Sequence, residues 1–255
     1  HIRHGSDTSC FSLETPQGLL VVDAGTGITR LSDRLILGKS ISDMTLFFTH
    51  WHLDHVMGLP CFAPIYQRKF NLDIFSSVAG PEARNVLARL FGPPFWPVPI
   101  DECNARIRYK LLPGTFEKPC ALRRYGVKIT WCPIRHPQPC VAYRFETERG
   151  SMVIATDREH GNPDLDRRFI KFAAGADVLV ADAQYLPAEY PSHAGWGHST
   201  WPEAVRTAQA AGVKRLILTH HDRLRTDAQI DGIVRAARHV FPKCEAARQG
   251  MTIDL

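Results

Sequence analysis

The sequence predicts an α/β protein, because short apolar runs with the length of buried strands alternate with segments that carry helix-capping signals. Four of the apolar runs lead into a residue with a metal-binding side chain, namely His50, His136, Asp157 and His220. A strand that ends at the rim of a sheet places its last residues where ligands and water reach them. The repetition of this arrangement predicts a chemical site built from several strand ends.

The stretch from residue 44 to 55, M-T-L-F-F-T-H-W-H-L-D-H, is the most informative of these runs. Its apolar half predicts a buried strand, and four potential ligands follow closely: His50, His52, Asp54 and His55. If the extended direction continues, His50 and His52 point the same way, while the other two fall on the next turn. An imidazole pair suits one metal ion, and a carboxylate with an imidazole suits a second ion nearby.

A hairpin is predicted before this motif. Residues 10–15 and 19–22 are the expected strands, and Pro16-Gln17-Gly18 is the turn. The second strand leads into D-A-G-T-G at 23–27, which either cradles a phosphate or forms a tight turn that holds Asp23 beneath the metal-binding histidines. The second interpretation is favoured, because no phosphate-loop lysine follows.

The segment after the motif predicts a proline-rich loop over 58–66, a strand over 70–75 and a helix over 81–90 that starts at a proline. Residues 92–99, G-P-P-F-W-P-V-P, predict a stiff extended loop, which either packs on the core or forms a wall or lid beside the site. Further strands are expected over 107–112 and 127–131, and the second of these leads to His136.

The second half of the chain predicts an antiparallel pair, 141–146 with 151–156, whose end delivers Asp157. Strands are also expected over 176–181 and 213–218, and an edge strand over 251–255. The first of these ends in Asp182, which either accepts an N–H from a ligand histidine or anchors a loop.

Capping residues predict three helices in the same half. Asn162 precedes a helix over 163–174, while Thr200-x-x-Glu203 and Thr226-x-x-Gln229 are capping boxes for helices that end near 211 and 240. His198 lies just before the second helix, where backbone N–H groups attract anions. It is therefore a candidate to contact a phosphate oxygen or to protonate a leaving group.

The composition argues against several classes of protein and of partner. The 255 residues are 44% hydrophobic and 22% charged, and no apolar run approaches a membrane span, so no membrane partner is expected. The net charge of +5 comes from scattered lysines and arginines, which indicate a nucleic-acid footprint only weakly. Seven cysteines without C-x-x-C predict reduced thiols in a cytoplasmic protein. The opening His1-Ile2-Arg3 has no initiator Met, so the natural chain is expected to begin further upstream.

H-x-H-x-D-H after an apolar strand resembles the signature of the metallo-β-lactamase superfamily. The D-A-G-T-G turn resembles the superfamily's early aspartate motif, and G-H-S-T-x-x-E-A at 197–204 resembles the ribonuclease Z and cyclic-phosphodiesterase-like branch. The resemblance implies a four-layer αββα sandwich of two mixed sheets flanked by helices, forming a single hydrolase domain over residues 1–255.

The resemblance also implies two divalent metal ions. Zinc is the default for an all His/Asp set, with manganese or iron as alternatives. Carried over residue by residue, the first ion takes His50, His52 and His136, the second takes Asp54, His55 and His220, and Asp157 bridges them. Asp54 and His198 are the candidate catalytic residues.

The activity so implied is hydrolysis by a metal-bound hydroxide, with a small-molecule or nucleotide phosphodiester as substrate. A lactone or thioester hydrolase would keep the same ligands, and an RNA-processing nuclease is a further alternative. The long basic, Gly-rich arm of ribonuclease Z proteins has no counterpart here. A nucleic-acid-binding scaffold without catalysis would lack a ligand, whereas every ligand position is filled. Neither the natural substrate nor the oligomeric state follows from the sequence.

Overall fold

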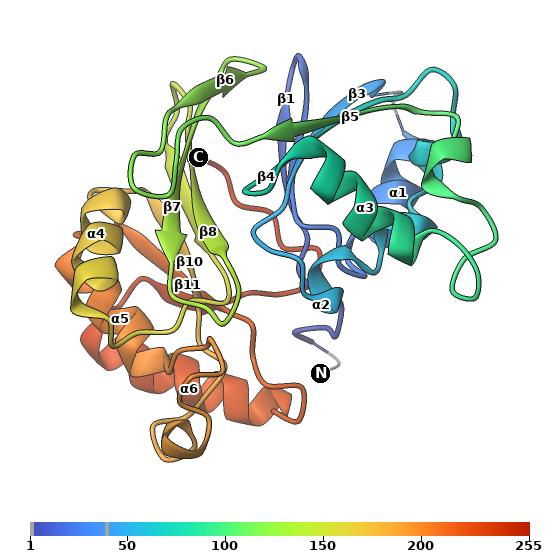
Figure 1. Ribbon diagram of the computed structural model, residues 1–255. Coiled ribbons are helices and arrows are strands. Elements are labelled where there is room, and N and C mark those ends of the chain that lie inside the picture. Colours follow the sequence, from blue (N-terminus) through green and yellow to red (C-terminus); the bar gives the residue numbers. More distant parts are fainter. Residues whose placement is uncertain (1–2, 39–40) are drawn as a thin grey trace. The chain divides into compact units, whose positions relative to one another are not determined.

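The computed structural model describes residues 3–38 and 41–255 (Figure 1). The opening residues His1 and Ile2 lie outside the described part. The chain divides into two compact units. We call residues 7–115 with 123–126 the N-terminal unit, and residues 1–6, 116–122 and 127–255 the C-terminal unit. That the whole chain forms one domain stays a prediction.

The N-terminal unit contains a sheet in the order β1-β2-β3-β4-β5. The hairpin is confirmed, since β1 pairs antiparallel with β2, and the remaining neighbours are parallel. Parallel pairing explains why β2, β3 and β4 are almost wholly buried. The strands are β1 (Phe11–Thr15), β2 (Gly18–Val22), β3 (Asp43–Phe47), β4 (Asn71–Ser76) and β5 (Arg106–Leu111).

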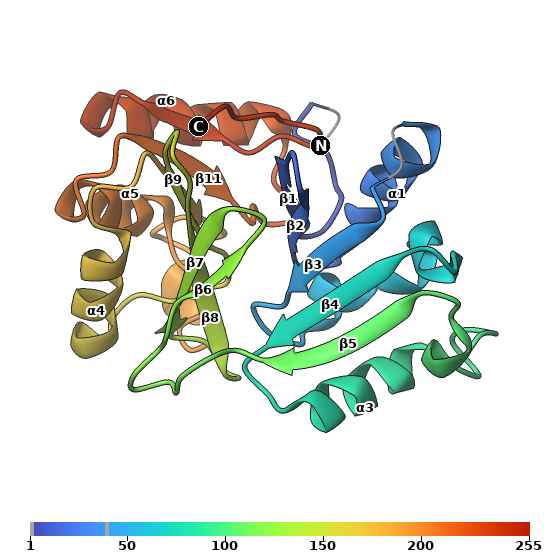
Figure 2. The ribbon, with the colours of Figure 1, turned by 90° about the horizontal axis from the view of Figure 1, so that it is seen from above.

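Helices α1 (Ile28–Leu37) and α3 (Gly80–Leu90) cover one face of this sheet (Figure 2). Helix α1 was not predicted, although Ile28, Leu31 and Leu35 recur at helical spacing and face the core. The loop predicted over 58–66 contains two 3₁₀ helices, Leu59–Cys61 and Ala63–Tyr66. Each has a proline in its first turn, where proline favours the start of a helix. The short helix α2 (Leu53–Val56) and a 3₁₀ helix over Ile100–Glu102 complete the unit's helices.

Residues 92–99 form a loop, as predicted, but the prediction that this loop is extended is wrong. The amides of Phe95 and Trp96 both donate to the carbonyl of Gly92, at 2.9 and 2.8 Å, so the chain turns there. Trp96 packs against the core and donates from Nε1 to the Tyr66 hydroxyl at 2.8 Å, as the packing alternative expects. Phe95 is 74% exposed. A role for this segment as a wall or lid stays a prediction.

The C-terminal unit contains strands β12-β11-β10-β9-β8-β7, in this order, of a seven-stranded sheet. The last strand in the sheet order is β6 (Leu122–Arg124), whose residues are divided between the two units. Strands β8 and β9 pair antiparallel, as predicted. Strand β7 also pairs antiparallel with β8, while β9 to β12 run parallel. Helices α4 (Pro163–Ala173), α5 (Trp201–Ala210) and α6 (Asp227–Val240) pack on one face of it (Figure 2). The strands are β7 (Val127–Ile134), β8 (Cys140–Glu146), β9 (Ser151–Ala155), β10 (Val178–Asp182), β11 (Arg215–Thr219) and β12 (Cys244–Ala246).

Two of the three predicted helix caps are confirmed. Asn162 accepts from the amides of residues 164 and 165, and Thr226 forms the full capping box with Gln229. Thr200 makes no side-chain cap, and the Glu203 carboxylate, which would complete the box, pairs with Arg206. The edge strand predicted over 251–255 is also wrong. Strand β12 pairs with β11 instead, and residues 251–255 are irregular.

The seven cysteines are free thiols, as predicted. Of the helices within residues 3–38 and 41–255, none has the length and apolar character needed to cross a bilayer.

Candidate metal centre

Asp23 organises the histidine motif of the N-terminal unit. It follows β2 with a φ of +60° and is fully buried. Its Oδ2 accepts from His55 Nδ1 at 2.7 Å and from the Thr49 hydroxyl at 2.8 Å, and its Oδ1 accepts from the Thr49 amide at 2.8 Å. Burial raises the pKa of Asp23, and the bonds from His55 and Thr49 oppose that rise. The prediction that Asp23 supports the metal-binding histidines from beneath therefore agrees with the geometry.

These bonds assign the proton positions on two histidines. His55 donates from Nδ1 to a carboxylate, so its Nε2 keeps the lone pair. The Thr49 hydroxyl donates its one proton to Asp23, so it accepts from His50 Nδ1 at 3.0 Å, and His50 Nε2 likewise keeps the lone pair. A hydrogen bond from the second nitrogen is the usual support for a metal-binding imidazole.

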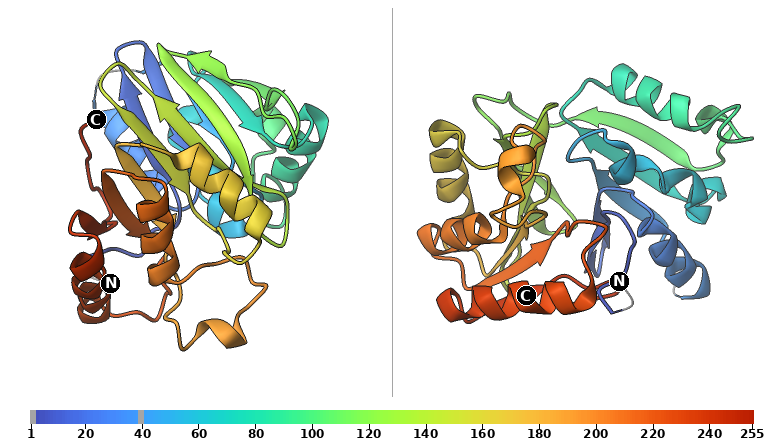
Figure 3. Two further views of the ribbon diagram at one scale, coloured as in Figure 1. Left: turned by 90° about the vertical axis from the view of Figure 1, so that its left-hand side faces the viewer. Right: turned by 90° about the horizontal axis from the view of Figure 1, so that it is seen from below.

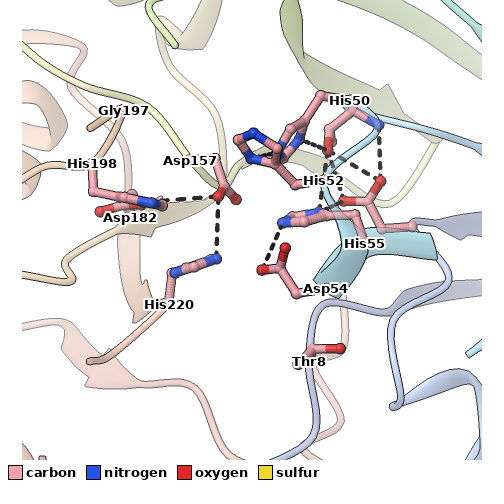
Figure 4. Close-up of polar contacts among 12 residues, drawn as sticks. Thr8, His50, His52, Asp54, His55, Asp157, Asp182, Gly197, His198 and His220 are labelled. Atoms are coloured by element: carbon pink, nitrogen blue, oxygen red, sulfur yellow. Dashed lines mark hydrogen bonds and ion pairs between the residues drawn. The ribbon is translucent and has the colours of Figure 1, made fainter. Parts of the chain in front are cut away.

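The ligand atoms of the motif converge (Figure 4). His50 Nε2 lies 3.0 Å from His52 Nδ1, and His55 Nε2 lies 3.4 Å from Asp54 Oδ2. Two ligands held at 2.0–2.1 Å in tetrahedral geometry would be roughly 3.3 Å apart, so both pairs have a spacing that one ion can bridge. Asp54 lies in the first turn of α2, and its side chain is 39% exposed.

The D-A-G-T-G turn fixes the motif through close backbone contact. Ala24 donates to the carbonyl of His55 at 2.7 Å, and Gly58 donates back to Ala24 at 2.9 Å. A Cβ at Gly25 would lie 2.3 Å from the Asp54 carbonyl oxygen, and one at Gly58 would lie 2.1 Å from the Gly25 carbonyl oxygen. Glycine is therefore required at both positions, for approach and not for phosphate binding.

In the C-terminal unit, Asp157 follows β9 and His220 follows β11. Their side chains meet, with His220 Nε2 3.2 Å from Asp157 Oδ1 (Figure 4). His220 Nδ1 lies 3.2 Å from Gln184 Oε1, an oxygen that accepts hydrogen bonds, so Nε2 is the nitrogen that faces Asp157. Asp157 is 1% exposed.

Residues with a left-handed backbone conformation occur at the same strand ends. Of the four non-glycine residues with positive φ in the described part of the chain, three are Asp23, Asp157 and His220, at +60°, +53° and +57°. Such conformations cost free energy and persist only where surrounding contacts impose them, and they concentrate at functional sites.

His136 lies just beyond β7, and its Nδ1 donates to the carbonyl of Gly197 at 3.1 Å. Because a carbonyl only accepts, His136 also keeps the lone pair on Nε2. Gly197 has a φ of +93°, and a Cβ there would lie 2.1 Å from His136 Nδ1. The residue at 197 must therefore be glycine for the imidazole to take this position.

The carboxylate of Glu159, 1% exposed, holds this glycine. Its Oε2 accepts from the Gly197 amide at 3.0 Å, and its Oε1 accepts from the Gly195 amide at 2.7 Å and the Tyr190 hydroxyl at 2.8 Å. Burial acts to raise the pKa of Glu159, but these donors and the Arg135 guanidinium outweigh it, so the pKa lies below its usual value. Sequence reasoning missed Glu159, which carries no motif.

Asp182 proves to be the partner of His198. Its Oδ2 accepts from His198 Nδ1 at 2.8 Å, and its Oδ1 accepts from the Ser199 amide at 2.9 Å. Asp182 therefore accepts an N–H from a histidine, as one of the two predictions expects. That histidine is His198, which is not one of the predicted metal ligands. Ligand atoms of Asp182, His198 and His220 lie within 4.8 Å of one another, so His198 stands beside a predicted metal ligand of its own unit.

Residues 20–221 match the family described as the Beta-lactamase superfamily domain. The chain belongs to the metallo-β-lactamase superfamily. Its two mixed sheets with flanking helices agree with the αββα sandwich of that superfamily, as predicted. The family match, together with the ribonuclease Z relatives described next, identifies the chain as a metal-dependent hydrolase.

This superfamily member is similar to ribonuclease Z proteins. Ribonuclease Z of Methanothermobacter thermautotrophicus is 26% identical over 295 residues, which cover 96% of this chain and 90% of the relative. Ribonuclease Z of Bradyrhizobium sp. is 25% identical, covering 89% and 87%.

Solved structures share the fold of this superfamily member. The metallo-beta-lactamase fold protein YhfI from Bacillus subtilis has a TM-score of 0.70 at 21% identity, covering 96% of this chain and 90% of that one. The short form of human tRNase Z has a TM-score of 0.65 at 20% identity, covering 85% and 86%.

Proposed function

We propose that this superfamily member hydrolyses phosphodiesters with two divalent metal ions, for which zinc is the default. In this proposal His50, His52 and His136 would hold the first ion, Asp54, His55 and His220 would hold the second, and Asp157 would be shared by both.

The observation that carries the proposal is a shared tautomer. His50, His55, His136 and His220 each have an acceptor for an Nδ1 proton within their own unit, so in the metal-bound protein Nε2 of each would carry the lone pair. A histidine that only packs in a core has no need of one particular tautomer, whereas a metal ligand does. The donor set of imidazoles and carboxylates fits zinc and also admits manganese or iron.

When bound, divalent ions supply acidification of a water molecule and polarisation of a phosphoryl oxygen. The chain supplies the remaining steps. The carboxylate of Asp54, which is 39% exposed, would orient the attacking water and accept its proton. Asp182 holds His198 by Nδ1, so His198 can donate from Nε2 to a phosphate oxygen or to the leaving group, and the carboxylate stabilises the charged imidazole.

An RNA-processing nuclease is the second candidate, and the ribonuclease Z relatives favour it. The alignment with the Methanothermobacter protein runs over 295 positions, more than the 255 residues of this chain, so that relative has residues without a counterpart here. This difference favours a smaller or less structured phosphodiester as the substrate.

The test uses Asp54→Ala on the metal-loaded protein, with bis-p-nitrophenyl phosphate and a lactone as parallel substrates. We expect the phosphodiester to be turned over and the lactone not, and the variant to lose well over tenfold in rate, which is about 1.4 kcal/mol of barrier. Asp33→Ala changes an exposed carboxylate on α1 and should keep full activity. Lactone turnover without phosphodiester turnover would replace the proposal with the lactonase alternative.

A further inference from the structure

An exposed tryptophan stands next to the glycine that supports His136. Trp196 is 60% exposed and lies in the segment of residues 185–198, which we call the aromatic loop. This loop joins β10 to α5, contains a 3₁₀ helix (Tyr190–Ser192), and extends away from the sheet of the C-terminal unit (Figure 3).

The aromatic loop is rigidly anchored, and its anchors hold the backbone on both sides of Trp196. Gly195 and Gly197, both with positive φ, donate to the two oxygens of the one buried carboxylate, Glu159. Further along, the buried Arg225 forms a two-pronged ion pair with Glu189, with N···O distances of 2.9 and 2.6 Å. The exposure of Trp196 is therefore imposed by the structure and is not the result of a loose loop.

A row of aromatic rings connects Trp196 to His198. Tyr185, which is buried, contacts His198 edge-on at a centroid distance of 6.0 Å. On its other side Tyr185 stacks on His193 at 4.5 Å, and His193 meets Trp196 edge-on at 4.8 Å. An edge-on contact covers at most one face of the indole. Trp196 is thus the exposed end of a fixed row whose other end is the proposed proton donor.

We propose that Trp196 stacks on a nucleobase of a single-stranded nucleic-acid substrate, at a nucleotide some distance along the strand from the cleaved phosphate. An indole held outward suits any base, because every base has a flat face. The net charge of +5 is compatible with a polyanion, and the choice of nucleic acid follows from the proposed cleavage of phosphodiesters. This inference rests on the proposed phosphodiesterase function and names its substrate class. Trp196 is a specificity-determining residue in it, outside the catalytic set.

The test measures binding by fluorescence anisotropy, with a labelled single-stranded RNA that carries phosphorothioate linkages to slow cleavage. An abasic strand of equal length is the matched ligand. Base stacking of about 1–3 kcal/mol corresponds to roughly 5- to 150-fold in Kd. We therefore expect Trp196→Ala to weaken RNA binding within that range and Trp196→Phe to restore most of it. The abasic strand should bind the wild type and Trp196→Ala equally.

Phe95→Ala is the matched protein control, because Phe95 is a similarly exposed aromatic residue in the other unit. It should bind RNA as the wild type does. The inference is overturned if the wild type does not bind RNA, if it binds RNA and the abasic strand alike, or if Trp196→Ala binds RNA normally. A change of oligomeric state in Trp196→Ala, seen by sedimentation, would overturn it in favour of a protein contact.

Turnover of bis-p-nitrophenyl phosphate separates this inference from the function it rests on. Trp196→Ala should retain that turnover within about twofold, because the small substrate does not reach the end of the aromatic row. A wild-type protein that binds RNA through Trp196 but hydrolyses no phosphodiester would refute the proposed function and leave the stacking role standing.

Discussion

His198 Nδ1 lies 2.8 Å from Asp182 Oδ2, and the other oxygen of that carboxylate binds the amide of Ser199. One buried side chain thus sets both the tautomer and the position of the imidazole. Because Nδ1 is engaged, any proton that His198 transfers to a substrate comes from Nε2.

His198→Ala should lower kcat by about 10²–10⁴ on a phosphodiester with a poor leaving group, the usual contribution of a general acid. The loss should be much smaller with p-nitrophenolate, which leaves without protonation. Metal content should not change. Equal losses on the two substrates would indicate phosphate binding instead of acid catalysis, loss of metal would make His198 a ligand or a structural residue, and full activity would remove His198 from the reaction.

Asp23→Ala should weaken metal binding by about 10–100-fold, because His55 loses the acceptor of its Nδ1 proton. Asp23→Asn should lose less, since an amide oxygen can still accept that proton. Metal affinity is measured by competition with a chromogenic chelator, and circular dichroism checks that the variants fold. If Asp23→Ala folds and binds metal as tightly as the wild type, the proposed support of His55 is wrong.

The purified protein should hold about two divalent ions per chain by elemental analysis, and chelation should lower its Tm. At a free metal concentration of 100 times Kd, one bound ion stabilises the folded state by about 2.7 kcal/mol. His50→Ala should lose metal, whereas His239→Ala, which changes an exposed histidine on the last turn of α6, should not. Absence of metal even after reconstitution with zinc or manganese contradicts the proposed centre.

Asp177 should make folding stability depend on acid pH. Hydrogen bonds from Lys214 and from the Ser151 amide lower the pKa of Asp177 to about 2, from 3.8. Because the folded-state pKa is lower than the unfolded one, this stabilisation is present above about pH 4 and is lost as the pH falls towards 2. Urea unfolding at pH 5 and pH 2.5 should show a smaller pH effect in Asp177→Asn than in the wild type. Asp164→Asn, which changes an exposed carboxylate, serves as the control.

The sequence alone was sufficient to predict which residues lie at the ends of three strands. The apolar runs before His50, Asp157 and His220 become β3, β9 and β11, because a run of that length has few other ways to bury its side chains. The caps at Asn162 and Thr226 were equally local, since each depends on residues within one helical turn. Such features are predictable because the interacting groups are neighbours in the chain.

Only tertiary structure decided which partners these residues take. Thr200 and Glu203 satisfy the capping-box pattern, yet the Thr200 side chain makes no cap hydrogen bond in the folded chain. Asp182 reaches His198 across 16 residues, and Glu159 reaches Gly197 across 38. A sequence specifies the donors and acceptors, but long-range pairs depend on which segments the packed core brings together. The tautomers on which the metal-centre proposal rests, and the exposure of Trp196, were therefore decided by the fold.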